Sequence, residues 1–475
     1  MRLVLIEACD PQRPIQVYMP MGLAYLKSYL ERLGAHQVFI ERDLESALAR
    51  NPEVIGISCV SPNFPHAIAL ARQAQQFTPA PLILGGAHIS GLPQSLPREF
   101  NAGVIGEGEQ TLEDLLSLLS ACPHPRPEQL RAIPGLVWHK HAESPKRLRK
   151  RDKTGDADVC NAGEGQTQVS AESDVCNASE GQTLKSSEST VEMSAPRQWL
   201  SDLDALPIPR RDWIKDRAPA LWSFSSRGCP YKCTFCSTAN FWERYRLHSP
   251  RYVTDELKQI MERHNPGIHI FMDDLFAANV ERLKEMRALF KRELPRSLPL
   301  VATVRADLVT PAIAQALRDL GVVFCHLGLE SASDRVLSYL KNQTTTAAIN
   351  QRALDLLSEY GLKAVGSFII GAPNEDDADL QATWDFIDKN SQSGKLQSFS
   401  FGPLVAFPGT KVWDDACARF KLDWRTLNWH SLDIDVRAFD LERYLLLSPL
   451  ERPRFGMWFE RFKKRWESQN QALTR

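Results

Sequence analysis

The amino-acid sequence predicts an α/β protein, with a doubly wound N-terminal domain followed by a full or partial barrel of parallel strands. Two observations carry this prediction. Aliphatic, strand-like runs alternate with helix-like stretches over residues 1–120, and a second series of the same kind begins at residue 220. The chain has 475 residues, which is long enough for two large domains.

The first series has five strand-like runs, at residues 2–8, 36–41, 53–61, 81–90 and 102–109. Helix-like stretches occupy residues 21–34, 44–50, 66–77 and 110–120. Because aliphatic strands that alternate with helices form a parallel sheet covered on both faces, we predict a doubly wound domain over residues 1–140. Ligands of such folds bind at the carboxyl ends of the strands.

A polar segment separates the two series. In residues 141–198 a ten-residue stretch, DVCNAGEGQT, starts at 158 and returns as DVCNASEGQT at 174. The segment has no aromatic or apolar periodicity, so we predict a flexible insert or linker.

The second series predicts a barrel over residues 199–420. Its strand-like runs are residues 221–226, 269–274, 300–306, 322–330, 364–371 and 398–405. Its helix-like stretches are residues 254–264, 279–294, 310–321 and 346–361. In barrels of parallel strands, the chemistry resides on the loops that follow the strands.

The remaining residues, 421–475, are predicted to form a helical extension. Aromatic residues recur at helical spacing over residues 454–466. The favoured interpretation is a helix that packs on the barrel. The alternative is a face for a membrane surface or an amphiphilic substrate.

Charge and cysteine content exclude several classes of protein. The 57 Lys and Arg residues balance 58 Asp and Glu residues, so no general attraction to nucleic acid or anionic membrane is expected. No run of 18 apolar residues predicts a membrane span, and the first residues do not resemble a secretion signal. Of ten cysteines, seven are scattered singly, which favours a reduced, cytoplasmic protein.

The other three cysteines, Cys229, Cys233 and Cys236, form a C-x3-C-x2-C motif directly after the first barrel strand. Three thiolates on one loop can hold three irons of a cubane iron–sulfur cluster and leave the fourth iron open, whereas four cysteines are usual. Zinc is the competing metal for this motif. It prefers four ligands in paired motifs, and the candidates for a fourth, Cys325 and His248, form no such pair.

The cysteine motif, with Phe235 before its last cysteine, resembles the radical S-adenosylmethionine (radical SAM) enzymes. Further similar segments follow in the superfamily's order over roughly residues 200–420: residues 271–276, the stretch around Arg305, and residues 326–333 and 368–375. Residues 206–213 resemble the lead-in segment of the subgroup that carries an N-terminal cobalamin-binding domain.

The resemblance implies a partial (β/α)6 barrel that holds a 4Fe-4S cluster and SAM. One electron from the cluster would cleave SAM to methionine and a 5'-deoxyadenosyl radical, which takes a hydrogen atom from the substrate. It also implies an electron donor such as a flavodoxin or ferredoxin. The three cysteines would bind the cluster, and SAM would contact Phe235, Arg305, Glu330, Ser331 and Gly371.

The implied roles differ among these residues. Phe235 would support the adenine, Glu330 and Ser331 would meet the ribose or amino group, and Arg305 would pair with the carboxylate. Gly371 would let the backbone approach the adenine. Alternatively, Arg305 and Glu330 form an ion pair that caps the strands.

Asp273 and Asp274 fit either positioning groups at the barrel mouth or a solvated turn. Neither reading is favoured from the sequence.

Residues 20–34, 83–90 and 103–116 resemble the cobalamin-binding domain of the same subgroup. The implied contacts are Ser58, Gly85, Gly86, Gly106 and Glu107. The usual D-x-H-x-x-G motif is incomplete, because the loop from Asp10 to Ile15 lacks both the histidine below cobalt and the final glycine. Either cobalamin binds without that histidine or the domain has lost it. His36 and His88 are isolated histidines for which a structural or surface role is favoured.

Three functions follow from the resemblance. The first is a cobalamin-dependent radical methyltransferase acting on an unactivated carbon of a small-molecule or lipid-like substrate. The second is a radical oxidation, cyclisation or rearrangement without methyl transfer. The third is a non-catalytic iron–sulfur sensor. Methylthio transfer is disfavoured, because that group has three more clustered cysteines near its N-terminus.

Overall fold

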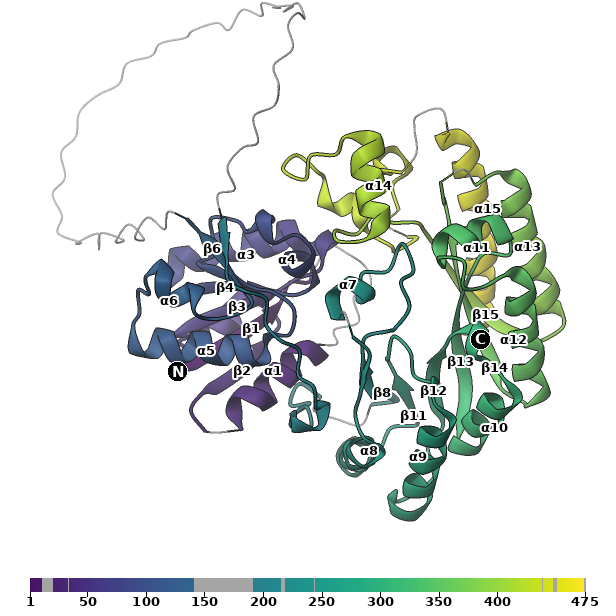
Figure 1. The fold of residues 1–475 in the computed structure, drawn as a ribbon, viewed down its shortest axis with the longest axis horizontal. Coiled ribbons are helices and arrows are strands. Elements are labelled where there is room, and N and C mark those ends of the chain that lie inside the picture. The colour runs from purple at the N-terminus through teal and green to yellow at the C-terminus, as the bar shows by residue number, and fades with distance from the viewer. Residues whose placement is uncertain are drawn as a thin grey trace, which may run out of the picture.

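The computed structural model describes residues 1–10, 20–32, 34–140, 191–214, 218–242, 244–373, 375–437, 439–446 and 451–473. These residues form two α/β domains that lie side by side (Figure 1). Helix α7 (Thr238–Trp242) lies between them and contacts α4 (Ala87–Gly91) of the N-terminal domain. The predicted α/β fold class is confirmed.

The N-terminal domain is built on a seven-stranded sheet of order β2-β1-β3-β4-β5-β6-β7. Its parallel strands are β1 (Arg2–Glu7), β2 (Gln37–Glu41), β3 (Val54–Ser58), β4 (Leu82–Gly85) and β5 (Ala102–Val104). The order in which these five strands pair is that of a doubly wound fold. Their carboxyl ends therefore lie at one edge of the sheet, which is where ligands of this fold bind.

Two antiparallel strands, β6 (Leu136–His139) and β7 (Val191–Met193), extend this sheet beyond β5. The predicted linker over residues 141–198 is wrong at its end, because β7 pairs with β6. Residues 141–190 lie outside the described residues, and the domain boundaries at 140 and 199 stay predictions. A three-residue strand is too short to show any periodicity of its own.

Helices cover both faces of the N-terminal sheet. One face packs against α1 (Met21–Glu31) and α5 (Gly108–Ala121) through Leu3 and Leu5 of β1. Val4 and Ile6 face the other side, towards α2 (Leu44–Ala49) and α3 (Phe64–Phe77). Successive strand residues point to opposite faces, and both faces are apolar, so the sheet is buried on both sides.

The second domain is a six-stranded parallel sheet of order β15-β14-β13-β12-β11-β8. Its strands are β8 (Ala220–Ser223), β11 (Ile268–Phe271), β12 (Leu300–Val304), β13 (Val322–Glu330), β14 (Lys363–Ile370) and β15 (Leu396–Pro403). Because the sheet runs in chain order and does not pair β15 with β8, it is a partial (β/α)6 barrel, as predicted.

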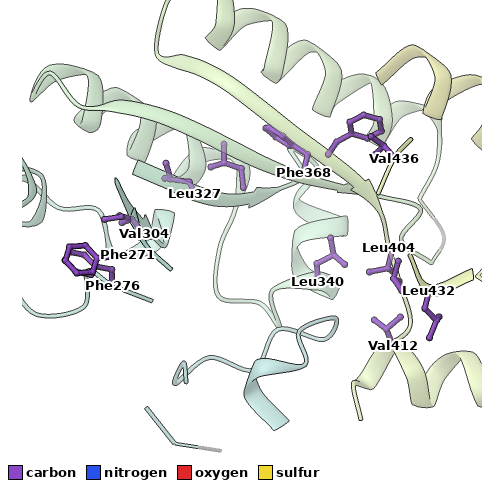
Figure 2. Close-up of a cluster of buried hydrophobic side chains, with 14 of the residues drawn as sticks. Phe271, Phe276, Val304, Leu327, Leu340, Phe368, Leu404, Val412, Leu432 and Val436 are labelled. Carbon is purple, nitrogen blue, oxygen red and sulfur yellow. The ribbon is translucent and has the colours of Figure 1, made fainter. Parts of the chain in front are cut away.

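Helices cover the outside of this barrel (Figure 1). They are α8 (Pro250–His264), α9 (Val280–Glu293), α10 (Pro311–Leu320), α11 (Asp334–Leu340), α12 (Ala347–Glu359) and α13 (Asp377–Gln392). The core between strands and helices includes Phe271, Val304, Leu327 and Phe368 from successive strands (Figure 2).

The chain after β15 links the two domains. It forms α14 (Lys411–Phe420), the short turns η5 (Trp429–Leu432) and η6 (Leu441–Arg443), and α15 (Arg452–Leu473). The ring of Trp429 lies 4.6 Å from that of His88 and 5.6 Å from that of Phe64 in the N-terminal domain. The predicted helical extension is therefore only partly helical, since the described residues between α14 and α15 form only the two short 3-10 turns η5 and η6.

His88 is fully buried and lies within hydrogen-bonding distance of Ser61 and Ser95. Its role is structural. His36 precedes β2, at the amino end of the sheet, and so lies away from the ligand edge.

Helix α15 packs on the barrel through Phe455, Phe459 and Phe462, all of which are buried. Phe459 and Phe462 contact Phe401 of β15, and the indole of Trp458 donates to Asp377 of α13 at 2.8 Å. This apolar face is covered by the barrel, which agrees with the favoured prediction over the membrane-surface alternative. None of the described helices is both long and apolar enough to cross a membrane.

Substitution Phe462→Ala tests this packing. The side chain is completely buried, so the cavity should lower the free energy of unfolding by about 3–5 kcal/mol. Met457, on the same helix, is 70% exposed, and Met457→Ala should change it by less than about 0.5 kcal/mol. Urea unfolding followed by tryptophan fluorescence measures both, and equal effects of the two variants would contradict the packing.

Candidate functional site

The three cysteines lie on the loop that joins β9 (Ser226–Arg227) to α7, at the carboxyl end of the first barrel strand. All three are free and half-buried. Thr234, between them, donates its backbone N–H to Leu340 O at 3.0 Å, and its carbonyl accepts from Val412 at 3.1 Å. The loop is thus fixed from α11 on one side and α14 on the other.

Burial raises the pKa of Cys229 to about 11 and also raises that of Cys236. As thiols alone these groups are therefore neutral, and a bound metal centre would supply the charge that stabilises their thiolates. Among the described residues, no three His, Cys, Asp or Glu side chains are arranged to hold a single metal ion.

The zinc alternative also lacks a fourth ligand. Cys325 is fully buried in the apolar core, and His248 lies 3.1 Å from a carboxylate oxygen of Asp204. A donor set of three thiols without a fourth protein ligand suits one side of an iron–sulfur cubane better than a structural zinc ion.

Arg305, at the end of β12, lies directly against this loop. Its guanidinium binds both carboxylate oxygens of Asp307 at 3.0 and 3.1 Å, and donates to Thr344 Oγ1 at 3.0 Å and to Cys233 Sγ at 3.5 Å. It also stacks on the ring of Tyr231, 3.5 Å from the centroid. A fixed positive charge therefore stands beside a thiol that would carry negative charge in a cluster.

Glu330, the last residue of β13, forms an ion pair with Lys341 at 2.8 Å, and both are buried. The alternative of an Arg305–Glu330 pair is therefore wrong, since each residue has its own partner. Burial disfavours the Lys341 ammonium, but Glu330 and Cys233 more than offset it and raise the pKa of Lys341. No sequence motif indicates Lys341, because a single lysine after a short helix forms no pattern.

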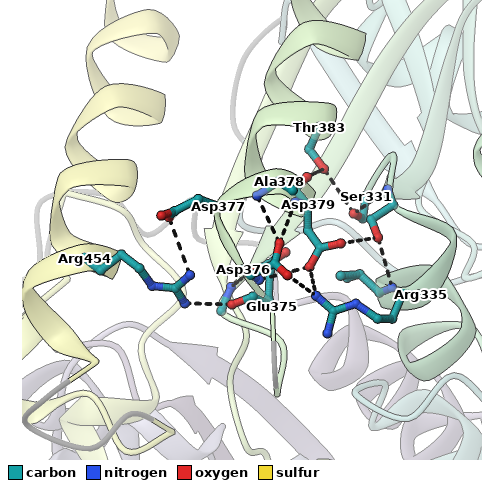
Figure 3. A network of polar contacts seen from close by, with 12 residues as sticks. Ser331, Arg335, Glu375, Asp376, Asp377, Ala378, Asp379, Thr383 and Arg454 are labelled. Atoms are coloured by element: carbon teal, nitrogen blue, oxygen red, sulfur yellow. Dashed lines mark hydrogen bonds and ion pairs between the residues drawn. The ribbon is translucent and has the colours of Figure 1, made fainter.

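The side chain of Ser331 points towards Thr383 (Figure 3). Its hydroxyl lies 3.0 Å from Thr383 Oγ1 of α13 and accepts from the backbone of Ser333 at 3.1 Å. Ser333 in turn donates to Asp379 at 2.6 Å. The side chain joins the β13 loop to α13. The backbone of Ser331 is also engaged, since its N–H donates to Leu329 O at 2.8 Å and its carbonyl accepts from Asn350 at 3.2 Å.

Gly371, after β14, has a φ of +92°, which favours glycine. A Cβ atom here would lie 2.6 Å from the hydroxyl of Tyr444 and 2.9 Å from the ring of Phe455. The close approach that requires glycine is therefore to the C-terminal segment, and the expected approach of adenine stays a prediction. The Gly371 N–H donates to Glu375 at 2.6 Å, and burial raises the pKa of Glu375 to about 7.

Asp273 is buried rather than part of a solvated turn. It accepts from the hydroxyls of Ser225, at 3.1 Å, and Ser226, and burial raises its pKa to about 6. Asp274 accepts from Thr238 of α7 at 2.9 Å. The two carboxylates thus hold the start of the cysteine loop and the helix that follows it.

The expected cobalamin contacts surround one narrow cavity of about 160 Å³ at the carboxyl ends of β3 and β4 and beside the loop after β5. They are Ser58, Gly85, Gly86, Gly106 and Glu107. A Cβ atom on Gly86, whose φ is +98°, would lie 2.5 Å from Cys59 O, whereas one on Gly85 would meet open space. Trp242 and Phe241 of the barrel domain also line this cavity. Residues 11–19 lie outside the described residues.

Glu107 lines this cavity, and its carboxylate is also held by the barrel domain. It accepts from Arg227 at 2.8 Å and from Arg246 at 2.9 Å, and Glu109 accepts from Arg227 at 2.7 Å. Burial alone would raise the pKa of Glu107, but the charges and hydrogen bonds of Arg227 and Arg246 outweigh the effect of burial and lower that pKa. Arg227 stands 120 residues away in the sequence, so no local pattern could reveal the pairing.

A doubly wound domain with a glycine-lined cavity, joined to a partial barrel with a three-cysteine loop, defines a two-domain protein of the radical SAM type. The profile of the radical SAM superfamily matches residues 223–387, and that of the B12 binding domain matches residues 16–116. The chain belongs to the radical SAM superfamily, in the group that carries a B12-binding domain ahead of the barrel.

Among curated relatives, an uncharacterized methyltransferase of Pyrococcus horikoshii is 27% identical over 86% of this chain and 80% of its own. The anaerobic magnesium-protoporphyrin IX monomethyl ester cyclase of Rubrivivax gelatinosus is 26% identical over 48% of this chain and 38% of its own.

Two solved structures share the whole two-domain fold. The radical SAM methyltransferase TsrM from Kitasatospora setae has a TM-score of 0.65 at 17% identity, covering 88% of this chain and 76% of TsrM. The cobalamin-dependent SAM radical enzyme OxsB has a TM-score of 0.62 at 16% identity, covering 98% of this chain and 61% of OxsB.

Breaking the pair between Glu109 and Arg227 tests the domain interface. Substitution Glu109→Ala leaves part of a buried guanidinium unpaired and should lower the free energy of unfolding by about 3–5 kcal/mol. Glu281→Ala removes an exposed ion pair with Lys284 and should cost less than about 1 kcal/mol. Urea unfolding compares them, and the interface assignment fails if both variants are equally stable.

The buried Glu375 predicts a pH dependence. Its folded pKa of about 7 lies above the unfolded value of about 4.3, so the folded chain keeps a proton that the unfolded chain has lost between these values. Stability should therefore fall as pH rises from 5 to 7.5, by at most about 1.4 kcal/mol per pH unit. Glu375→Gln should flatten this fall and exposed Glu460→Gln should not. Urea unfolding at both pH values measures it, and an unchanged slope in Glu375→Gln refutes it.

Proposed function

We propose that this chain is a cobalamin-dependent radical SAM methyltransferase that acts on an unactivated carbon. The observation that carries the proposal is the joint placement of two sites. The three-cysteine loop begins immediately after Arg227, and Arg227 lines the cavity of the B12-binding domain. When bound, the cluster would supply the electron that cleaves SAM, and cobalamin would carry the methyl group.

Cys229, Cys233 and Cys236 would hold the 4Fe-4S cluster. Arg305 and Lys341 are both buried near Cys233, where their charges offset the negative charge of thiolates and suit the carboxylate of SAM. Phe235 and Glu330 line the adjoining chamber and would border the adenosyl group.

The cavity at Ser58, Gly85, Gly86 and Gly106 would take part of cobalamin, since its apolar lining and bare backbone suit close approach of a flat group. Similar proteins support this assignment. TsrM has been solved with cobalamin and a [4Fe-4S] cluster, and OxsB with aqua-cobalamin and SAM. A 24% identical relative from Rhodopseudomonas palustris, over 45% of this chain, is a hopanoid C-2 methylase.

A second candidate is a radical cyclisation without methyl transfer. The match to magnesium-protoporphyrin monomethyl ester cyclases supports it, although it spans less than half of this chain.

We further propose a reduced, cytoplasmic setting, because all eight described cysteines are free. An electron donor such as a flavodoxin or ferredoxin would serve either reaction.

Anaerobic reconstitution with iron, sulfide and hydroxocobalamin tests the proposal. The wild type should bind about four irons per chain and retain corrinoid, while Cys233→Ser should lose the iron. Cys417→Ser changes a free, half-buried cysteine on α14 and should keep it. Stoichiometric zinc, or iron retained by Cys233→Ser, would contradict the cluster assignment.

Methyl-labelled SAM then separates the two reactions. The reconstituted protein should produce 5'-deoxyadenosine, and cobalamin-dependent transfer of the label supports methylation. Formation of 5'-deoxyadenosine with no transfer of label under any corrinoid condition would favour cyclisation instead.

A further inference from the structure

The barrel opens into a chamber of about 690 Å³ next to the cysteine loop. Phe235 and Glu330 border it, and the C-terminal halves of β14 and β15 form its wall. The segment Asp433–Arg437 closes the side where the barrel sheet is open, since a Cβ atom on Gly402 of β15 would lie 3.5 Å from Ile434 O.

We propose that this chamber binds a neutral, mainly apolar substrate whose single hydroxyl or amide group hydrogen-bonds to Ser367 and Ser400. The inference rests on the proposed function in one respect, because only an enzyme would use the bound molecule as its substrate. SAM would occupy the part of the chamber next to Phe235 and Glu330, and the substrate would occupy the part next to the two serines.

The wall of the chamber is largely apolar. Ile369, Leu404, Val405 and Phe407 line it, and Ile434 faces it with 59% of its surface exposed. An aliphatic side chain with this exposure gains stability when a ligand covers it, by about 25 cal/mol per Å² of apolar surface removed from water. The wall therefore favours an apolar molecule over a highly polar one.

Ser367 and Ser400 supply the hydrogen-bonding capacity of the wall. They are direct partners in the pairing of β14 with β15, their hydroxyls lie 3.1 Å apart, and both side chains are exposed. Each hydroxyl can donate once and accept twice, so the pair retains both a donor and acceptors for a ligand. A neutral hydroxyl or amide matches this pair without any charge.

The charges around the chamber disfavour an anionic substrate. Among the described residues that line it, Arg437 is the one cationic side chain. Its guanidinium already contacts both carboxylate oxygens of Asp435, at 2.9 and 3.0 Å. The pair carries no net charge, so a phosphate or carboxylate that entered the chamber would gain little attraction from Arg437 while it lost its hydration.

Displacement of the neutral dye Nile red from the full chain tests the proposal. The competitors share one carbon skeleton: farnesene is apolar only, farnesol adds a hydroxyl, and farnesyl phosphate is anionic. They are compared below the concentrations at which they self-associate. Farnesol should displace the dye at about a tenfold lower concentration than farnesyl phosphate and about a fivefold lower concentration than farnesene.

Variants test whether the preference for farnesol arises in this chamber. Ser400→Ala should remove the advantage of farnesol over farnesene, and Ser400→Phe should abolish dye binding, whereas Ser120→Ala and Ser120→Phe, on the N-terminal domain, should change neither. Asp435→Asn removes the charge that neutralises Arg437, so farnesyl phosphate should displace the dye at about a tenfold lower concentration.

The proposal is overturned if farnesyl phosphate competes as well as farnesol in the wild type, or if Ser400→Ala leaves the farnesol advantage intact. Dye binding that survives Ser400→Phe also overturns it. Dye displacement needs no cluster and no cobalamin. The preference for farnesol can therefore hold when methyl transfer fails, and methyl transfer can hold when the preference fails.

Discussion

Arg227 imposes the constraint on which the arrangement of the two domains depends. Its buried guanidinium binds Glu107 and Glu109 from the N-terminal domain, and the next residues of the chain lead into the cysteine loop. Separating the domains at this point would leave buried charges unpaired, at a cost of several kcal/mol. The glycine-lined cavity and the cysteine loop are therefore held beside one another, which transfer of a methyl group between two cofactors and a substrate requires.

The carboxyl ends of the barrel strands add the charges that an electron-rich cluster needs. Arg305 follows β12, and Lys341 is held by Glu330 at the end of β13, so two cations stand near Cys233 with their counter-ions already fixed. Neither cation has to reorganise when a cluster or a carboxylate binds. The C-terminal segment completes the site, because Tyr444 and Phe455 pack on Gly371 while residues 433–437 close the open side of the barrel.

Local sequence patterns predicted most of the fold but few of the side-chain contacts at the sites. Aliphatic strands alternating with helices indicated both sheets, and the cysteine spacing located the loop. Ser331, Gly371 and Glu107 are expected to contact ligands, and the structure adds neighbours that the sequence did not indicate: Thr383, Tyr444 and two arginines. Those partners lie far away in the sequence, 52 residues for Thr383, and they become neighbours only in the folded chain. Lys341 belonged to no motif, and β7 follows a long segment without strand periodicity.

Because Arg227 holds the two domains together, the cluster and cobalamin should lie at a fixed distance from one another. Pulsed EPR on the anaerobically reconstituted protein, with the cluster reduced and cobalamin in its paramagnetic Co(II) state, measures the dipolar coupling between the two centres. The wild type should show one well-defined coupling, and Arg227→Gln should broaden or remove it while iron content stays unchanged. If both centres bind without any coupling, or if the coupling in Arg227→Gln matches that of the wild type, the interface does not hold the cofactors together.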